Sequence, residues 1–294
     1  MWSRGQGLEI LVFGHVEEGS GRELDRPRWH NGNMAKRKVL ILQHAAWERP
    51  GRLGENLEDA GLETETLTVA SIKKPSLPEP GELAGLVLLG GPMRADDYEQ
   101  FPGLKAETKL AKAATEAELP VLGICLGHQI LARALGGELE PAKKERRELS
   151  TVKWVAADDA VPAWVQKETP VLQWHSDCVT LPPDAKLLAK SEATKVEAFR
   201  AGSALGLQFH VEVTGPLFEQ WLSEPEVVKG MKKGQIAQLL EDFQGKEALF
   251  QPLADAIFSA FAARCSTCAA QPTEEEAAAS DDEHKAGKHK GKNK

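Results

Sequence analysis

Alternating apolar and amphipathic segments between residues 38 and 135 constrain the fold of this chain more than any other feature. The apolar runs have the length of buried strands, and the segments between them carry helical periodicity. The strand-like runs are 38–43, 62–69, 84–90 and 120–124, and the helix-like segments are 54–60, 103–118 and 126–135. Strands and helices in repetition are typical of a parallel sheet with both faces covered. The sequence therefore predicts an α/β fold with an open, mostly parallel sheet and helices on both faces.

Between residues 149 and 209 the pattern changes to short, closely spaced strand-like runs. They are 149–156, 171–174, 186–190, 195–200 and 204–209. Short connections favour antiparallel pairing, because a parallel crossover needs a dozen or more residues. Helical segments are expected at 215–222, 226–242 and 246–264. Together these elements predict one α/β domain over residues 36–265.

The two ends of the chain differ from this domain in composition. Residues 1–35 are rich in Gly, Arg and Glu and are expected to form a poorly structured extension. Met34 precedes the first strand, so whether residues 1–33 are native or a translated leader stays open. Residues 266–294 run from acidic to lysine-rich and are expected to form a disordered charged tail, because they lack large apolar side chains near the end.

Charge and cysteine content narrow the class of protein. The 294 residues include 36 Lys plus Arg and 44 Asp plus Glu, a formal net charge of −8. This excess of negative charge argues against nucleic acid or an anionic membrane surface as a partner. Four cysteines are too few for a disulfide scaffold, and residues 1–33 do not resemble a secretory signal, so a cytoplasmic location is expected.

Cys125 lies at the junction of the strand-like run 120–124 and the helical segment 126–135. A nucleophile on such a tight turn is held above the carboxyl edge of the sheet. Gly123 and Gly127 allow the strained backbone that this turn requires. The positive end of the helix is expected to lower the pKa of the thiol. Taken alone, the motif fits a small buried side chain equally well.

A thiolate nucleophile needs a base, and the base needs an orienting group. His210 stands at the end of the strand-like run 204–209, and Glu212 follows two residues later on the same side of the strand. Another strand ends in two glycines and Pro92. Backbone N–H groups at such a turn can point at a developing oxyanion with no side chain between them.

Together these pieces resemble the class I, triad-type glutamine amidotransferase family, in order and spacing as well as in content. The resemblance covers roughly residues 37–225 and rests on Gly90–Met93 (GGPM), Gly123–Gln129 (GICLGHQ), Gln173–Asp177 (QWHSD), Leu181–Pro182 and Gly206–Glu212 (GLQFHVE). It is strongest for a free-standing branch similar to the amidotransferase domain of GMP synthase. It implies a flavodoxin-like open α/β sheet. One departure is Val211, where relatives often carry proline.

The resemblance implies a role for each matching position. Cys125 would be the nucleophile, His210 the base and acid, and Glu212 the orienting carboxylate. The main-chain N–H groups of Gly91 and Leu126 would form the oxyanion hole.

The glutamine pocket would be lined by five further residues, namely Gly90, Gln129, His175, Ser176 and Asp177. No metal or organic cofactor is implied.

The implied function is hydrolysis of the side-chain amide of glutamine through a cysteine thioester, which supplies ammonia to a separate acceptor enzyme. No ATP-pyrophosphatase loop follows residue 215, so a separate synthetase subunit would use the ammonia. Two alternatives stay open. A γ-glutamyl peptide hydrolase would use the same triad with another leaving amine, and a non-catalytic binding module would keep only the fold.

Three other features are given structural interpretations. Cys265 and Cys268 have metal-like spacing but no second pair, so neither a metal nor a redox site is expected. His128 follows the nucleophile closely and is assigned no catalytic role. The charged run 143–147 is interpreted as a solvated loop.

Overall fold

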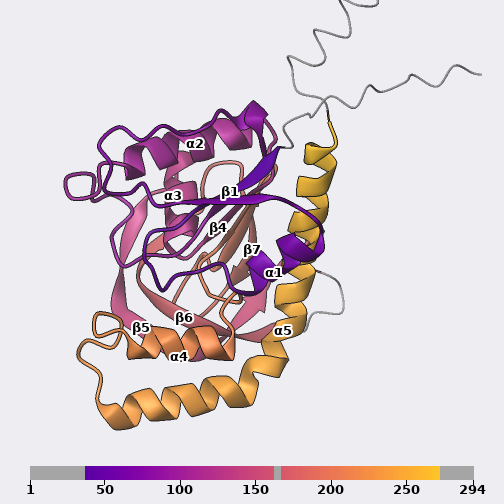
Figure 1. The fold of residues 1–294 in the computed structure, drawn as a ribbon. Coiled ribbons are helices and arrows are strands. Elements are labelled where there is room, and N and C mark those ends of the chain that lie inside the picture. Colours follow the sequence, from indigo (N-terminus) through magenta and orange to yellow (C-terminus); the bar gives the residue numbers. More distant parts are fainter. Residues whose placement is uncertain (1–36, 162–166, 272–294) are drawn as a thin grey trace, which may run out of the picture. The chain divides into compact units, whose positions relative to one another are not determined.

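The structure is a computed structural model that describes residues 37–161 and 167–271 (Figure 1). The expected N-terminal extension and nearly all of the expected charged tail lie outside these residues. The strands are β1 Lys38–Leu42, β2 Thr64–Leu67, β3 Leu83–Leu88, β4 Val121–Ile124, β5 Leu139–Trp154, β6 Glu168–Val179, β7 Lys186–Lys190, β8 Ala198–Ala201 and β9 Ala204–Leu207. The helices are α1 Arg52–Asp59, α2 Leu104–Glu116, α3 Leu126–Ala134, α4 Gly215–Ser223 and α5 Lys233–Ala269, with a short 3₁₀ turn at Pro80–Glu82.

All of these strands form one open sheet in the order β2-β1-β3-β4-β9-β8-β7-β5-β6. Neighbouring strands from β2 to β9 in this order pair in parallel, whereas the pairs β9–β8, β8–β7, β7–β5 and β5–β6 are antiparallel. The α/β fold class is confirmed, and the antiparallel pairing falls in the segment where short connections predicted it. The carboxyl ends of the parallel strands share one edge, where ligand sites of open α/β sheets form.

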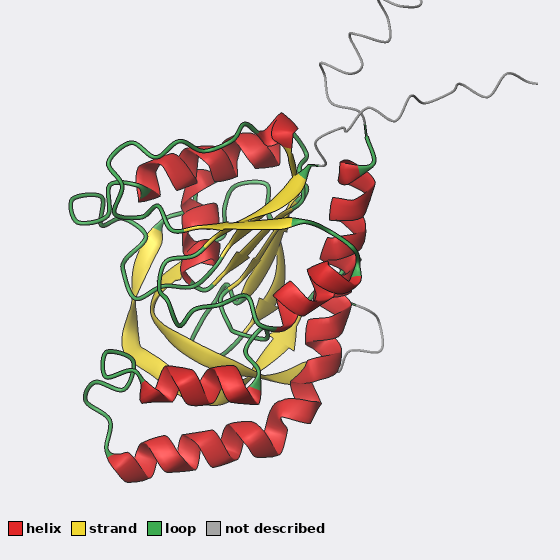
Figure 2. Cartoon of the chain, in the orientation of Figure 1, coloured by secondary structure: helices red, strands yellow, loops and turns green. Residues whose placement is uncertain are grey.

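Side-chain alternation along the parallel strands explains why both faces are covered. In β1, Val39 and Ile41 pack in one apolar cluster with α1 and α5, while Leu40 and Leu42 pack in a second cluster with α2 and α3. All four side chains are at most 1% exposed. Figure 2 shows helices on both sides of the yellow sheet. A strand buried on both faces must be apolar along its buried length, as β3 and β4 are throughout and β1 is after the exposed Lys38.

Helix α5 differs from the sequence prediction, which placed two helices at 226–242 and 246–264. One helix runs over Lys233–Ala269 with Pro252 inside it, and it bends along its length (Figure 1). A proline removes one helical hydrogen bond and clashes with the preceding turn, which accounts for a bend. The first half of α5 packs against α4 and the second half against the sheet. The expected boundary at residue 265 therefore falls inside a helix that continues to Ala269.

The charged run 143–147 is not the solvated loop that the sequence predicted. It lies within β5, which pairs with β6 along most of its length. Arg146 is buried because it bonds to the buried Glu197, a partner 51 positions away in the sequence. The charge run is thus part of a long, curled ribbon of two strands beside the carboxyl edge of the sheet (Figure 1).

Candidate active site

Cys125 occupies the turn between β4 and α3, as the strand-to-helix pattern predicted. Its backbone has φ 53° and ψ −105°, a left-handed conformation that costs a non-glycine residue strain. The turn is held by hydrogen bonds from Cys125 N to Leu207 O at 2.8 Å and from Gln129 N to Cys125 O at 3.1 Å. A Cβ on Gly127 would lie 2.0 Å from the carbonyl oxygen of Leu88, so only glycine allows α3 to approach β3 this closely.

The Cys125 thiol is buried, with 5% of the residue exposed, and its Sγ lies 3.4 Å from the carbonyl oxygen of Trp174. Burial raises the pKa of this thiol, and the positive charge of His210 opposes that rise. The sequence had instead predicted a pKa lowered by the helix N-terminus. That expectation is wrong for a thiol buried this deeply, because removal of the thiolate from water is the largest influence on its pKa.

His210 and Glu212 follow β9 and form a buried pair. His210 Nδ1 lies 2.6 Å from Glu212 Oε1, and the other carboxylate oxygen of Glu212 accepts a hydrogen bond from Val211 N at 3.0 Å. His210 N donates to Leu172 O at 2.9 Å, which ties this segment to β6. The indole of Trp221 packs edge-on against the imidazole, with ring centroids 5.0 Å apart.

The electrostatics of His210 link it to both neighbours. Burial by itself lowers the pKa of the imidazole, but the negative charges of Glu212 and of the Cys125 thiolate outweigh burial and raise it well above 6.5. Its Nε2 atom is buried and has no hydrogen-bond partner among the described residues. The structure thus brings Cys125, His210 and Glu212 together, with one imidazole nitrogen fixed and the other available.

Two backbone N–H groups lie beside the thiol. Gly91, Leu126 and Cys125 all line one pocket. Within residues 37–161 and 167–271, the N–H of Gly91 and the N–H of Leu126 have no hydrogen-bond acceptor. A Cβ on Gly91 would lie 2.7 Å from Leu126 Cδ2, so the glycine lets these two segments come together. Unpaired N–H groups at this place suit a developing oxyanion.

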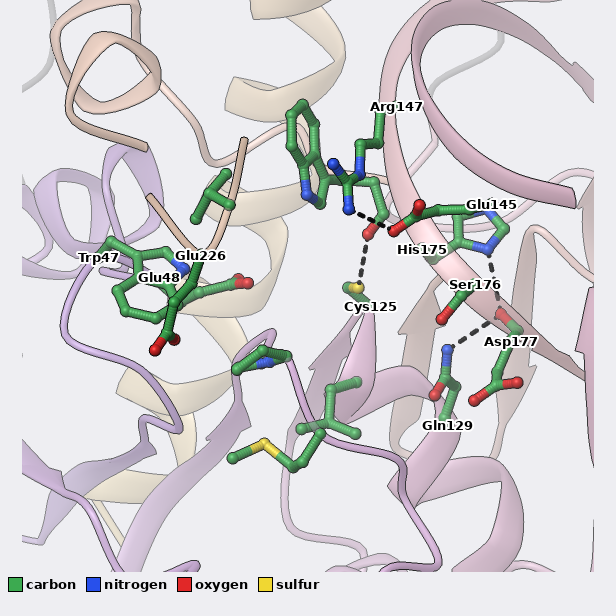
Figure 3. Close-up of a pocket in the computed structure, with 16 residues that line it drawn as sticks. Trp47, Glu48, Cys125, Gln129, Glu145, Arg147, His175, Ser176, Asp177 and Glu226 are labelled. Carbon is green, nitrogen blue, oxygen red and sulfur yellow. Dashed lines mark hydrogen bonds and ion pairs between the residues drawn. The ribbon is translucent and has the colours of Figure 1, made fainter. Parts of the chain in front are cut away.

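Figure 3 shows Gln129, Ser176 and Asp177 on one side of Cys125. The amide nitrogen of Gln129 donates to Asp177 O at 3.1 Å, which fixes the orientation of that side chain. The carboxylate of Asp177 accepts hydrogen bonds from Arg94 Nη1, 3.0 Å from each oxygen. Gly90, also expected in the pocket, is not among the residues that line it.

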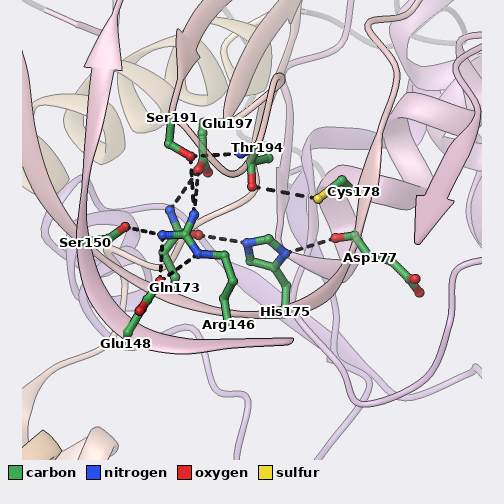
Figure 4. A network of polar contacts seen from close by, with 10 residues as sticks. All are labelled: Arg146, Glu148, Ser150, Gln173, His175, Asp177, Cys178, Ser191, Thr194 and Glu197. Atoms are coloured by element: carbon green, nitrogen blue, oxygen red, sulfur yellow. Dashed lines mark hydrogen bonds and ion pairs between the residues drawn. The ribbon is translucent and has the colours of Figure 1, made fainter. Parts of the chain in front are cut away.

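His175 lines the same pocket, and each of its ring nitrogens faces an oxygen atom that only accepts, so the neutral ring donates to one of the two. Nδ1 lies 3.0 Å from Asp177 O, and Nε2 lies 2.9 Å from Gln173 Oε1. Gln173 in turn donates to Glu197, which also accepts from Arg146 (Figure 4). Burial lowers the pKa of His175 to about 4, so the ring is neutral. This network supports the wall of the pocket from behind.

His128 lies outside the pocket, buried and packed against Phe199 with ring centroids 5.0 Å apart. Burial lowers the pKa of His128 to about 3. Of the two cysteines with metal-like spacing, Cys265 is buried and Cys268 lies near the carbonyl oxygen of Leu83. No group of three or more His, Cys, Asp or Glu side chains in the described part of the chain is placed to hold a metal ion.

Sequence reasoning missed several residues of the site. Trp47 and Glu48 line the pocket on the side of Cys125 opposite Gln129, together with Glu226 (Figure 3). Glu48 is 7% exposed, and its Oε2 has no hydrogen-bond partner in the described residues. One signal was available, because Glu48 follows the carboxyl end of β1 and such ends meet at the site edge of a parallel sheet.

Arg147 was also missed, because the run that contains it was interpreted as a loop. Its guanidinium lies over the ring of Trp174, 5.6 Å from the centroid, and bonds to Glu145 at 2.7 Å. All three residues line the pocket. The long ribbon of β5 and β6 therefore supplies a charged rim to the site.

None of the described helices is long and apolar enough to cross a membrane.

Comparison with known proteins gives one consistent family. The model of the family Glutamine amidotransferase class-I matches residues 52–228. The chain is 34% identical over 149 residues to a glutamine-hydrolysing GMP synthase subunit from Ignicoccus hospitalis, covering 49% of this chain and 76% of that protein. It is 33% identical over 162 residues to the corresponding subunit from Sulfolobus acidocaldarius, covering 54% and 81%.

Solved structures agree with this result. A glutamine amidotransferase from Thermotoga maritima is 29% identical and superposes with a TM-score of 0.71, over 78% of this chain and 99% of that chain. A glutamine amidotransferase from Methylobacillus flagellatus is 26% identical, with a TM-score of 0.69 over 78% and 96%. The matched sequence, the shared fold and the arrangement around Cys125 lead to one conclusion: the chain belongs to the class-I glutamine amidotransferase family.

Proposed function

We propose that this protein hydrolyses the side-chain amide of glutamine and releases ammonia for a separate acceptor enzyme. One observation carries the proposal. The thiol of Cys125 lines a pocket that also holds two unpaired backbone N–H groups, and it lies beside a buried imidazole with a free Nε2 and a carboxylate bonded to its Nδ1. The names of the similar GMP synthase subunits support glutamine as the substrate.

In the proposed mechanism, Cys125 Sγ transfers its proton to His210 Nε2 and attacks the amide carbon of glutamine. The amide oxygen takes the negative charge and is bound by the N–H groups of Gly91 and Leu126, each contributing about 3 kcal/mol in comparable sites. His210 then gives the proton to the amide nitrogen as the C–N bond breaks. Ammonia leaves, and a γ-glutamyl thioester remains on Cys125.

The second half of the reaction reverses the proton transfer. His210 takes a proton from a water molecule, and the water oxygen attacks the thioester carbon. Glutamate leaves as the C–S bond breaks, and the proton returns to Cys125. Glu212 takes no part in these proton transfers, because its role is to orient the imidazole and to stabilise its positive charge.

A substrate panel on the full chain tests this proposal. Glutamine, γ-glutamyl dipeptides and glutathione are compared by measuring the ammonia or amine that is released, with Cys125→Ala as the control. We expect ammonia from glutamine and none from the variant. Release of ammonia by Cys125→Ala at the wild-type rate would overturn the assignment of the nucleophile.

A γ-glutamyl peptide hydrolase is the second candidate, and the shape of the pocket favours keeping it. The pocket continues past Cys125 toward Trp47 and Glu226, on the side away from Gln129 (Figure 3). A substituent on the amide nitrogen could extend in that direction. Faster turnover of γ-glutamyl peptides than of glutamine would select this candidate. Failure of every substrate in the panel would favour a binding module.

A further inference from the structure

His44 and Glu107 form a buried polar pair that the proposed mechanism does not use. His44 follows β1, and Glu107 lies in the first turn of α2. His44 Nε2 lies 2.7 Å from Glu107 Oε2, and the two side chains are 0% and 1% exposed. The second ring nitrogen, Nδ1, lies 3.1 Å from the carbonyl oxygen of Gly90. A buried ionisable pair is costly to keep, so its contacts call for an explanation.

The carbonyl that His44 contacts belongs to the peptide unit that joins Gly90 to Gly91. In a trans peptide the C=O and the N–H point in opposite directions. Holding the Gly90 carbonyl on the His44 side therefore aims the Gly91 N–H away from His44. The two segments are in close contact, since a Cβ on Gly91 would lie 2.7 Å from His44 Cβ and 2.7 Å from Leu126 Cδ2. Rotation of this peptide would lose the hydrogen bond to His44.

The protonation of His44 follows from its partners. A carbonyl oxygen only accepts hydrogen bonds, so Nδ1 must carry a hydrogen. Burial lowers the pKa of His44, but the hydrogen bond and charge of Glu107, the Gly90 carbonyl and the charge of Glu48 outweigh burial and raise it. A cationic donor on the carbonyl polarises the peptide and strengthens its N–H as a donor.

We propose that His44, held by Glu107, is a positioning residue that fixes and polarises the Gly90–Gly91 peptide so that the Gly91 N–H binds the oxyanion. The inference rests on the proposed function, because it needs a reaction in which a carbonyl oxygen gains charge. It assigns His44 no contact with the substrate. It makes the strength of one oxyanion donor depend on a pair that lies behind the pocket.

The test separates attack on an amide from reactivity of the thiol. Glutamine hydrolysis needs the oxyanion donors, whereas alkylation of Cys125 by iodoacetamide does not. The first variant is His44→Leu/Glu107→Leu, which removes both charges together and leaves no unpaired buried ion. We expect kcat for glutamine to fall at least about tenfold, and up to the 10²–10³-fold loss of a whole donor. The alkylation rate is expected to stay at the wild-type value.

A second variant, Glu107→Gln, keeps the size of the side chain and the hydrogen bond but removes the negative charge. The polarising charge of His44 is present while the imidazole is protonated and is lost as the pH rises through its raised pKa, whereas the Nδ1 hydrogen bond that fixes the carbonyl remains. Glu107→Gln lowers that pKa, so the alkaline limb of kcat should move to lower pH. The pH profile of alkylation should not move with it.

Asp158→Asn is the matched control, because Asp158 pairs with Arg200 in a partly buried contact outside the pocket and the variant should leave kcat unchanged. The inference would be overturned if kcat for glutamine and the alkylation rate of Cys125 fell by the same factor in the double variant. An unchanged kcat in that variant would overturn it as well. An unmoved alkaline limb in Glu107→Gln would do so even where the double variant fails to fold. If the wild-type protein hydrolyses none of the substrates, the proposed function itself fails. That result can be told apart from a failure of the inference about His44, which needs an active wild type.

Discussion

Glu48 offers a direct test of the electrostatics of the pocket. Its carboxyl is buried, with 7% of the residue exposed, and its Oε2 has no hydrogen-bond partner in the described part of the chain. Burial raises the pKa of Glu48 from its ordinary value of 4.5 to about 7, against the opposing charge of His210. In the unfolded chain the same carboxyl ionises at its ordinary pKa. At pH values between 4.5 and about 7, Glu48 therefore keeps a proton in the folded protein that it has released in the unfolded chain.

The sign and size of the effect follow from this difference. Stability falls with pH wherever the folded state binds more protons than the unfolded state. Each pKa unit is worth about 1.4 kcal/mol, so Glu48 lowers the free energy of unfolding by about 3 kcal/mol as the pH rises through this range. The glutamine side chain in Glu48→Gln cannot ionise, so the free energy of unfolding of this variant does not fall in this way. Relative to wild type, the variant should therefore gain about 3 kcal/mol between about pH 4.5 and pH 8.

Urea unfolding followed by tryptophan fluorescence measures this difference at a series of pH values. Subtracting the wild-type free energy from that of the variant removes the groups that titrate alike in both proteins. Glu55→Gln, at an exposed position of α1, makes the same chemical change without burial, and its difference should stay within about 0.5 kcal/mol at every pH. A difference for Glu48→Gln that does not change with pH would refute the reasoning.

Three further predictions follow from particular contacts. Gly127→Ala would press a methyl group into the backbone of β3 and should cost about 1–3 kcal/mol in urea unfolding, whereas Gly81→Ala meets no atom within 4 Å and should not. Glu212→Gln should lower kcat by about 10²–10⁴-fold in the ammonia assay and leave measurable activity, because the side chain orients the imidazole without reacting. Arg146→Met leaves the carboxylate of Glu197 buried without its cation and should cost about 3–5 kcal/mol in thermal unfolding, and a smaller loss than 1 kcal/mol would contradict the ion pair.

Most of the parallel half of the sheet could be predicted because its signals are local. The strand β4 and the helix α3 meet at Cys125 within a few residues of where the apolar run ends. The ribbon of β5 and β6 could not be predicted in this way. Its charged side chains argue for a loop until Glu197, far along the sequence, is known to pair with Arg146.

The same distinction applies to the site. The residues around Cys125, His210 and Glu212 were found because each lies in a short motif at the end of a strand. His44 carries no such motif, and its meaning comes from Glu107, which lies 63 positions away on α2. Contacts between segments far apart in the sequence decide which buried polar residues have partners. Such contacts cannot be predicted from the residues next to each position.

The position of Glu212 explains how the buried thiol of Cys125 can pass its proton to His210 and act as a nucleophile. Burial raises the thiol pKa of Cys125, so a lone thiolate would be scarce, but passing its proton to His210 creates an ion pair with no change in net charge. A nearby negative charge raises both pKa values, and the ion pair gains only if that charge acts more strongly on the imidazole. Glu212 meets this condition, because it is hydrogen-bonded to His210 at 2.6 Å and is the weakest of the influences on the thiol. The contact that orients the imidazole therefore also favours the thiolate.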